Sequence, residues 1–314
     1  MSLAISKHIS PLMHMPMPKE KVVVVMGATG TGKTRLSIDL ATRFEAEIIN
    51  SDKIQVHQGL EITTNKITDE ERCGVPHHLL GIADPDSDFS VADFCDAALV
   101  SIKSILSRNK LPIIVGGSNS FVEALVDVNF QSKYDCCFLW VDVAMPVLHS
   151  YVCDRVDKMV EKGMVDEVRN FYDPNADYST GIRRAIGVSE LDEFFRMEWI
   201  CGKETRKIFL EKAIDSIKIN TCTLAERQLK KIQRLNRKWN IHRLDATVVF
   251  QKREGKEGEM DASWRNTVAT TGIEVVSNFL YDLNPAYSAI THIGKVRTHI
   301  GEGRRSIILT DLMV

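Results

Sequence analysis

Short apolar runs alternate with amphipathic stretches along the first half of the chain. Residues 21–26 (KVVVVM) are a β-branched run that ends in a glycine, as expected for a buried parallel strand. Similar runs predict strands at residues 47–52, 111–117 and 136–142. Helical spacing of apolar residues begins at about residue 33 and recurs over residues 91–106. This alternation predicts an α/β fold, a parallel sheet with helices on both faces that binds ligands at the carboxyl ends of its strands.

The pattern changes after Pro146, where helical spacing takes over. Apolar residues lie on one helical face over residues 147–160, and the spacing breaks near Gly163. It resumes over residues 165–171 and then continues through residues 205–239 as one long helix. We therefore predict that a helical subdomain is appended to the sheet, with Phe194, Phe195 and Trp199 in its core.

The predicted organisation has four parts. They are a disordered tail or short transit peptide over residues 1–20, an α/β core over 21–145, the helical subdomain over 146–240, and a C-terminal segment over 241–314. In the last part, residues 241–245 predict a strand that returns to the sheet. Residues 251–266 are charged and contain glycine, which favours a loop.

Composition narrows the class of partner. The 314 residues include 40 Lys plus Arg against 42 Asp plus Glu, and 44% are hydrophobic. This near-neutral balance gives no global positive field for RNA or DNA, so we expect a small or acidic substrate and no tRNA. The apolar runs are far shorter than the roughly 20 residues that span a bilayer, so we expect no membrane insertion. We also expect a monomer.

The cysteines and the N-terminal residues indicate the cellular compartment of the protein. The seven cysteines form no CxxC pair and no Cys/His array with zinc spacing, which favours buried thiols in a reducing compartment. The first 20 residues carry four methionines and no acidic residue before Glu20. This bias resembles a short organelle transit peptide, although arginine is absent, and it favours a plastid. The alternative is a disordered tail on a cytoplasmic enzyme.

Residues 27–34 (GATGTGKT) match the GxxxxGK[ST] phosphate-binding motif between a predicted strand and a predicted helix. The glycines allow backbone N–H groups to surround phosphate oxygens, and the lysine adds a full charge at the helix N-terminus. The motif therefore predicts a P-loop NTPase-like core and a bound di- or triphosphate. The predicted phosphate-binding residues are Gly27, Ala28, Thr29, Gly30, Thr31, Gly32, Lys33 and Thr34, with the Thr34 hydroxyl as a Mg²⁺ ligand.

The P-loop alone does not select a reaction, because kinases, GTPases and ATPases share it. Residues 65–68 (NKIT) lack the aspartate of a guanine-specific NKxD motif, and residues 111–115 run into Gly-Gly-Ser without the carboxylate of a mechanical ATPase. A small-molecule kinase stays open. Asp52 ends the strand after the P-loop helix, so it should face the phosphates. It suits either a kinase or an alkyl transfer to an amine, which needs a base.

Several sequence motifs favour the second possibility, alkyl transfer to an amine. They are GATGTGKT, EIINSDKIQV, GVPHHLLG, DFSVADF, IIVGGSNSF, RVDKMVEKGMVDEV and YSTGIRRAIGVSELDEF, in this order between residues 22 and 245. They resemble adenylate isopentenyltransferases, especially the plant enzymes that begin cytokinin synthesis, and are more distantly similar to tRNA dimethylallyltransferases. The resemblance implies that the P-loop holds the pyrophosphate of dimethylallyl diphosphate.

The same resemblance implies a role for individual residues. Asp52 would remove the proton from adenine N6, and Thr29 would hydrogen-bond the oxygen between the prenyl C1 and the diphosphate. Lys33, Thr34 with Mg²⁺, and either Arg183 or, preferably, Arg184 would neutralise the departing pyrophosphate. The predicted acceptor-binding residues are Ser51, Asp52, Thr64, Lys66, Ser118 and Asn119.

The remaining predictions concern the acceptor substrate and two histidines. Free AMP, ADP or ATP is preferred over tRNA, because no C-terminal zinc finger or basic RNA-binding surface is present. A tRNA dimethylallyltransferase, a small-molecule kinase and a non-catalytic nucleotide-binding regulator remain as alternatives. His77 and His78 lack a third ligand at zinc spacing, so a structural hydrogen-bonding pair is expected.

Overall fold

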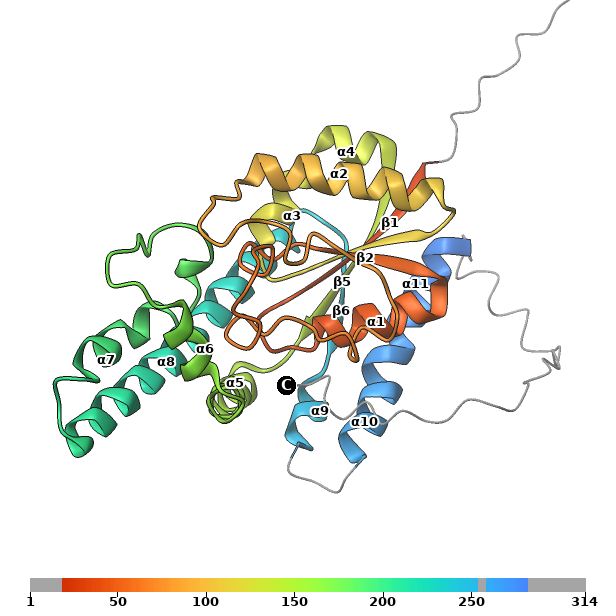
Figure 1. Cartoon of the computed structure of the whole chain (residues 1–314). Helices are drawn as coiled ribbons and strands as arrows, with labels where there is room; N and C mark the ends of the chain where they lie inside the picture. Colours follow the sequence, from red (N-terminus) through yellow and green to blue (C-terminus); the bar gives the residue numbers. More distant parts are fainter. Residues whose placement is uncertain (1–18, 254–257, 282–314) are drawn as a thin grey trace, which may run out of the picture.

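A computed structural model of the chain describes residues 19–253 and 258–281. Within these residues a six-stranded sheet forms the centre of the molecule (Figure 1). Its strands are β1 (Glu20–Gly27), β2 (Ala46–Asn50), β3 (His77–His78), β4 (Leu111–Val115), β5 (Tyr134–Asp142) and β6 (Ile241–Asp245). The predicted tail over residues 1–20 and the C-terminal segment beyond residue 281 lie largely or wholly outside the described residues.

The sheet is parallel throughout and has the order β3-β2-β4-β1-β5-β6. The predicted α/β fold is confirmed. Val22, Val23, Val24 and Val25 of β1 are all fully buried, because a central parallel strand is covered by helices on both faces. The candidate returning strand is β6, which pairs with β5. The carboxyl ends of β1, β2 and β4 therefore meet at one edge of the sheet.

Helices cover both faces of the sheet and extend beyond it (Figure 1). The α-helices are α1 (Lys33–Phe44), α2 (Val91–Ser107), α3 (Asn119–Leu125), α4 (Val128–Lys133), α5 (Met145–Glu161), α6 (Met164–Phe171), α7 (Asp192–Met197), α8 (Lys203–Leu235), α9 (Thr247–Gln251), α10 (Glu259–Trp264) and α11 (Thr270–Tyr281). The 3-10 turns η1 (Gly181–Arg184) and η2 (Ser189–Leu191) and the π-helical turn η3 (Arg265–Ala269) complete the elements. In the described part of the chain, no helix has both the length and the apolarity needed to cross a membrane.

Three apolar cores match this arrangement. One core lies between the sheet and α1, α9, α10 and α11, and the second lies between the sheet and α2, α3 and α4. The third joins α5, α6, α7 and α8 into a subdomain beside the sheet. The 33-residue helix α8 contributes to all three: Ala225 packs in the first core, Ile232 and Leu235 in the second, and Ala213 and Ile217 in the third. Phe194 and Phe195 are buried in the subdomain, but the prediction for Trp199 is wrong, since it is 85% exposed.

The loop predicted over residues 251–266 is also wrong for its second half, which forms α10 and the start of η3. Trp264 is fully buried there, and its indole N–H donates to Asp39 of α1 at 2.7 Å. Arg35 of α1 lies over the Trp264 ring and pairs with Asp261 at 2.8 Å. These contacts join segments about 225 residues apart, so local charge and glycine content do not report them.

Candidate functional site

A cavity of about 560 Å³ lies where the carboxyl ends of β1, β2 and β4 face α5 and α8. Its charged lining is mostly basic, although the net charge of the whole chain is −2. The basic lining residues are Lys33, Lys53, Arg155, Arg184 and Arg227, against Asp52 and Glu71. A concave site with this excess of positive charge suits an anionic ligand.

The loop between β1 and α1 forms one wall of the cavity. Thr29, Gly30, Gly32, Lys33 and Thr34 line it. Gly30 has a φ of 81°, and a Cβ there would lie 2.7 Å from Cγ1 of Val152 in α5. The loop therefore needs glycine at this position both for its backbone conformation and for its close packing on α5.

The other residues of the motif support the loop without lining the cavity. They are Gly27, Ala28 and Thr31, and the Thr31 hydroxyl donates to the Ala28 carbonyl at 3.0 Å. The Lys33 ammonium also donates to this carbonyl, at 2.7 Å. Burial lowers the pKa of Lys33 to about 8, an effect that Asp52 opposes and Arg155 reinforces. An anion in the cavity would raise this pKa again.

Thr29 is held from the subdomain side by two residues that sequence reasoning missed. Arg155 of α5 donates through Nη2 to the Thr29 hydroxyl oxygen at 2.9 Å. Gln228 of α8 accepts from the Thr29 backbone N–H at 2.7 Å and donates to the Gly117 carbonyl at 3.0 Å. Because Arg155 occupies a lone pair of the hydroxyl, the hydroxyl proton is left to donate to another group.

Asp52 has one carboxylate oxygen fixed and the other open. Its Oδ1 accepts from the backbone N–H groups of Ile54 at 2.9 Å and Gln55 at 3.3 Å, which is an Asx-type turn. Asn50 steadies the same turn by accepting from the Asp52 N–H and donating to the Leu79 carbonyl. Oδ2 accepts no hydrogen bond from the residues that the structure describes. The carboxylate is thus oriented but able to accept a proton.

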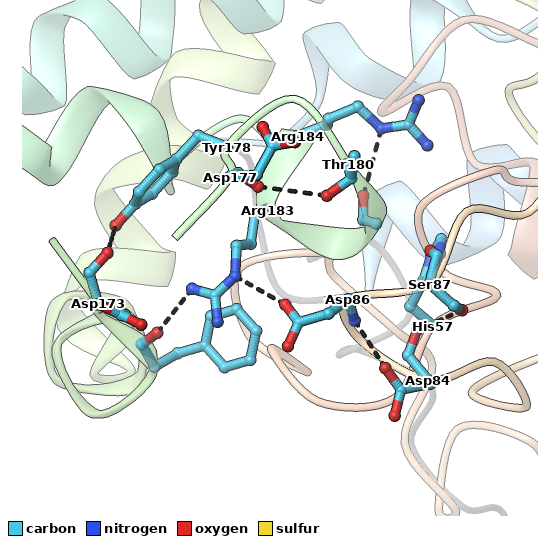
Figure 2. A network of polar contacts seen from close by, with 12 residues as sticks. His57, Asp84, Asp86, Ser87, Asp173, Asp177, Tyr178, Thr180, Arg183 and Arg184 are labelled. Atoms are coloured by element: carbon cyan, nitrogen blue, oxygen red, sulfur yellow. Dashed lines mark hydrogen bonds and ion pairs between the residues drawn. The ribbon is translucent and has the colours of Figure 1, made fainter. Parts of the chain in front are cut away.

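The two neighbouring arginines separate clearly (Figure 2). Arg184 lines the cavity, and its guanidinium approaches Asp88 at 3.4 Å. Arg183 points the other way, to Asp86 at 2.7 Å and to the Phe171 carbonyl at 3.1 Å, with its guanidinium 4.4 Å from the Phe171 ring. Arg183 does not line the cavity, so of the two predicted diphosphate ligands only Arg184 is placed to reach an anion there.

The predicted acceptor residues are divided in the same way. Asp52 and Thr64 line the cavity, whereas Ser51, Lys66, Ser118 and Asn119 do not. The buried Lys66 ammonium donates to the Gly59 carbonyl and pairs with Glu61. Ser118 accepts from the Lys53 N–H at 2.9 Å, and Asn119 donates to the Gln228 carbonyl at 3.5 Å. Ser118 and Asn119 thus bond to Lys53 and Gln228, which do line the cavity.

The two histidines have different surroundings. His78 lies 2.7 Å from the Glu47 carboxylate, and His77 contacts the Val75 carbonyl at 2.8 Å through Nδ1. His77 lines the cavity, and burial lowers its pKa. Among the described residues, no group of three or more His, Cys, Asp or Glu side chains is arranged to hold a metal ion.

Comparison with known proteins places this site in a family. The model of the IPP transferase family matches residues 55–132 and 126–235. The chain is 61% identical to adenylate isopentenyltransferase 3, chloroplastic, of Arabidopsis thaliana, over 85% of this chain and 81% of the relative. It is 52% identical to adenylate isopentenyltransferase 7, mitochondrial, of the same plant, over 85% and 82% of the two chains. The chain belongs to the IPP transferase family.

Solved structures agree with this assignment to the IPP transferases. A eukaryotic dimethylallyltransferase acting on tRNA superposes with a TM-score of 0.70 at 25% identity, covering 84% of this chain and 80% of the other. The resemblance stated from the sequence blocks is therefore confirmed at the level of the family.

The P-loop wall of the cavity offers one candidate ligand for Mg²⁺. The Thr34 hydroxyl lines the cavity and makes no hydrogen bond to the described residues, so it is available as a ligand. One hydroxyl without a cluster of carboxylates fits a Mg²⁺ ion that takes most of its ligands from phosphate and water. The residues present fit the ion only together with a bound diphosphate.

Proposed function

We propose that this IPP transferase moves the dimethylallyl group of dimethylallyl diphosphate to N6 of the adenine of free AMP, ADP or ATP. The relatives named adenylate isopentenyltransferases support the adenylate as acceptor. The observation that carries the chemistry is the open Oδ2 of Asp52 in the same cavity as the cationic P-loop. This arrangement supports a base and a leaving-group site that lie side by side.

The donor end of the reaction is assigned to the P-loop wall. The diphosphate lies against Gly30, Gly32 and Lys33 at the N-terminus of α1, where backbone N–H groups and the helix dipole favour an anion. Thr29 donates its hydroxyl proton to the oxygen that bridges C1 and the diphosphate, while Arg155 holds the hydroxyl in place. Thr34 would hold Mg²⁺ together with the phosphates, and the ion would supply further positive charge there.

The acceptor end is assigned to Asp52. Adenine N6 is a weak nucleophile because its lone pair is delocalised into the ring, so transfer requires alignment and removal of a proton. As the N6–C1 bond forms, the C1–O bond breaks, the N6 proton passes to Asp52 and diphosphate leaves. Lys33, Arg155 and Arg184 compensate the charge that develops on the leaving group.

One assay tests the proposal. The protein is incubated with Mg²⁺, dimethylallyl diphosphate and AMP, ADP, ATP or unmodified tRNA, and N6-prenyl product and diphosphate are both measured. We expect equal amounts of the two products with the free nucleotides. Prenylated product with tRNA alone would show that the protein is a tRNA dimethylallyltransferase. A phosphorylated product without a prenyl adduct would show that it is a kinase.

We further propose a plastid location and a monomeric state. The first relative is named chloroplastic and the second mitochondrial, which supports an organelle in general. Expression of the full chain with a fluorescent C-terminal fusion tests the organelle, and a signal spread through the cytoplasm would contradict it. Light scattering of the purified chain at assay concentration tests the monomer.

A further inference from the structure

Helices α5 and α8 pack side by side (Figure 1), and each carries a cysteine at their contact. The sulfur atoms of Cys153 and Cys222 are 3.8 Å apart, although the two residues are 69 positions apart in the sequence. Both cysteines are half-buried and free. A disulfide has an S–S bond of about 2.05 Å, so the two sulfurs must approach by roughly 1.8 Å to bond.

We propose that Cys153 and Cys222 are a redox-modification site, at which a small disulfide of the glutathione class converts the two thiols into an α5–α8 disulfide. The thiolate of Cys153 attacks the disulfide and forms a mixed disulfide, releasing one small thiolate. The thiolate of Cys222 then attacks the Cys153 sulfur and releases the second. Two electrons pass from the protein to the small disulfide, and the two thiol protons end on its thiols.

The surroundings of the two sulfurs assign the order of attack. Cys222 lies beside Glu226, which pairs with His149 at 3.4 Å, and burial with Cys153 and Glu226 raises the pKa of Cys222 to about 11. Cys153 lies near the Lys218 ammonium, which pairs with Asp157 at 2.6 Å. A neighbouring anion disfavours a thiolate, so Cys222 is the resolving thiol and Cys153 the attacking thiol.

The position of the pair connects it to the cavity. Arg155 follows Cys153 by two residues on α5, and Gln228 follows Cys222 by six on α8. These are the two side chains that hold Thr29. Drawing the sulfurs together shifts the helices that carry them, and misplacement by about 1 Å can cost a reaction on the order of 100-fold. We expect the disulfide to lower kcat/KM for prenyl transfer about tenfold, an expectation that rests on the proposed function.

The bond itself is tested without an activity assay. The full chain is incubated with glutathione disulfide at pH 8, remaining thiols are alkylated, and peptides are analysed by mass spectrometry with and without reductant. We expect a Cys153–Cys222 linked peptide in the wild type and in the control Cys73→Ser. Cys222→Ser should instead retain glutathione on Cys153, and Cys153→Ser should form neither product. Linkage of other cysteines, or none in folded wild type, would overturn the proposal.

Prenyl transfer is then measured before and after oxidation. A reductant-reversible loss in the wild type and in Cys73→Ser, absent from Cys153→Ser, which forms neither product, supports control of the site. A linked peptide with unchanged kcat/KM would overturn that control while leaving the bond established. Absence of prenyl transfer in the reduced protein would contradict the proposed function and leave the thiol chemistry testable by mass.

Discussion

The two ends of strand β2 carry carboxylates with opposite surroundings. Glu47, near its start, has a side chain only 5% exposed, with Arg108 and His78 each within 2.7 Å and Lys110 within 3.5 Å. Burial opposes its ionisation, but hydrogen bonds from Arg108 and His78 outweigh burial and hold the pKa of Glu47 at about 2. Asp52, just past the other end, keeps Oδ2 without a hydrogen bond from the described residues.

This difference separates structural charge from functional charge. A carboxylate whose oxygens are all paired is a poor base, because proton uptake would break the hydrogen bonds that stabilise it. A carboxylate with one fixed and one open oxygen keeps its orientation and can still accept a proton. Glu47 therefore stabilises the fold at the amino edge of the sheet, whereas Asp52, at the carboxyl edge, is our proposed base.

The largest expected effect comes from Asp52→Asn. The amide keeps the Asx-type turn through its oxygen but cannot take the N6 proton, so we expect kcat to fall about 1,000-fold. Binding of a non-reactive thiol analogue of dimethylallyl diphosphate should change little. Calorimetric titration with this analogue is the control, and a loss of affinity as large as that of Lys33→Ala would make Asp52 a structural or metal-holding residue.

Glu47→Gln should act on stability and leave catalysis intact. The pKa of Glu47 in the folded chain is about 2, below its ordinary value of 4.5. Its stabilisation is therefore complete above about pH 4.5 and is lost as the pH falls towards 2, with a magnitude of about 3 kcal/mol at neutral pH. Urea unfolding between pH 3 and 7 measures this, and the variant should lose the part of the pH dependence that Glu47 supplies. A lower kcat/KM for the folded variant would show that Glu47 also takes part in catalysis and would contradict this comparison.

Arg155→Met tests the missed arginine on the catalytic side. The substitution removes the hydrogen bond to the Thr29 hydroxyl and one positive charge from the cavity, so we expect kcat/KM to fall about 100-fold. Thr29→Val should produce a loss of similar size, and the double variant should lose little more, because both changes remove one interaction. Fully additive losses would show that the two residues act separately.

Arg184→Gln and Arg183→Gln form a matched pair. Arg184 lines the cavity and is partly exposed, so its loss should raise KM for the diphosphate substrate about tenfold with little change in melting temperature. Arg183 is buried against Asp86 and Phe171, so its loss should lower the melting temperature by several degrees and spare KM. Reversed results would exchange the two roles.

The smallest effect concerns pH and Lys33. Burial lowers the pKa of Lys33 to about 8, and a bound diphosphate would raise it by supplying an opposite charge. Binding must then take up a proton above pH 8, and affinity for the diphosphate should fall about threefold between pH 7.5 and 8.5. Titrations in two buffers of different ionisation heat measure the uptake, and Lys33→Met should abolish this dependence.

Sequence reasoning succeeded where the signal is local. The P-loop and Asp52 each follow an apolar strand, so the parallel sheet brings them to the same edge. Arg155 and Gln228 were missed because they reach Thr29 across 126 and 199 residues. Arg155 did leave one sign in the sequence. It is a charge on the apolar face of α5, next to Val152, Val156 and Met159.

Long-range packing also decides which predicted site residues line the cavity. Arg183 and Arg184 are adjacent, and only the conformation of η1 decides which one faces the cavity. The same holds for Lys66, Ser118 and Asn119. They occur in motifs near the site, but their hydrogen-bond partners are other residues of the protein. The helix α10 forms because Trp264 packs on α1, which no property of residues 251–266 alone predicts.

The packing of Gly30 on Val152 also limits how this enzyme can diverge. Any side chain at residue 30 would meet α5 before it met a phosphate, so the loop and the subdomain must change together. A chimera that exchanges the segment 146–240 between relatives should work only when α5 keeps a small enough residue opposite the loop. We therefore expect substitutions in the two halves of the cavity to be coupled, even though the halves are separate segments of the sequence.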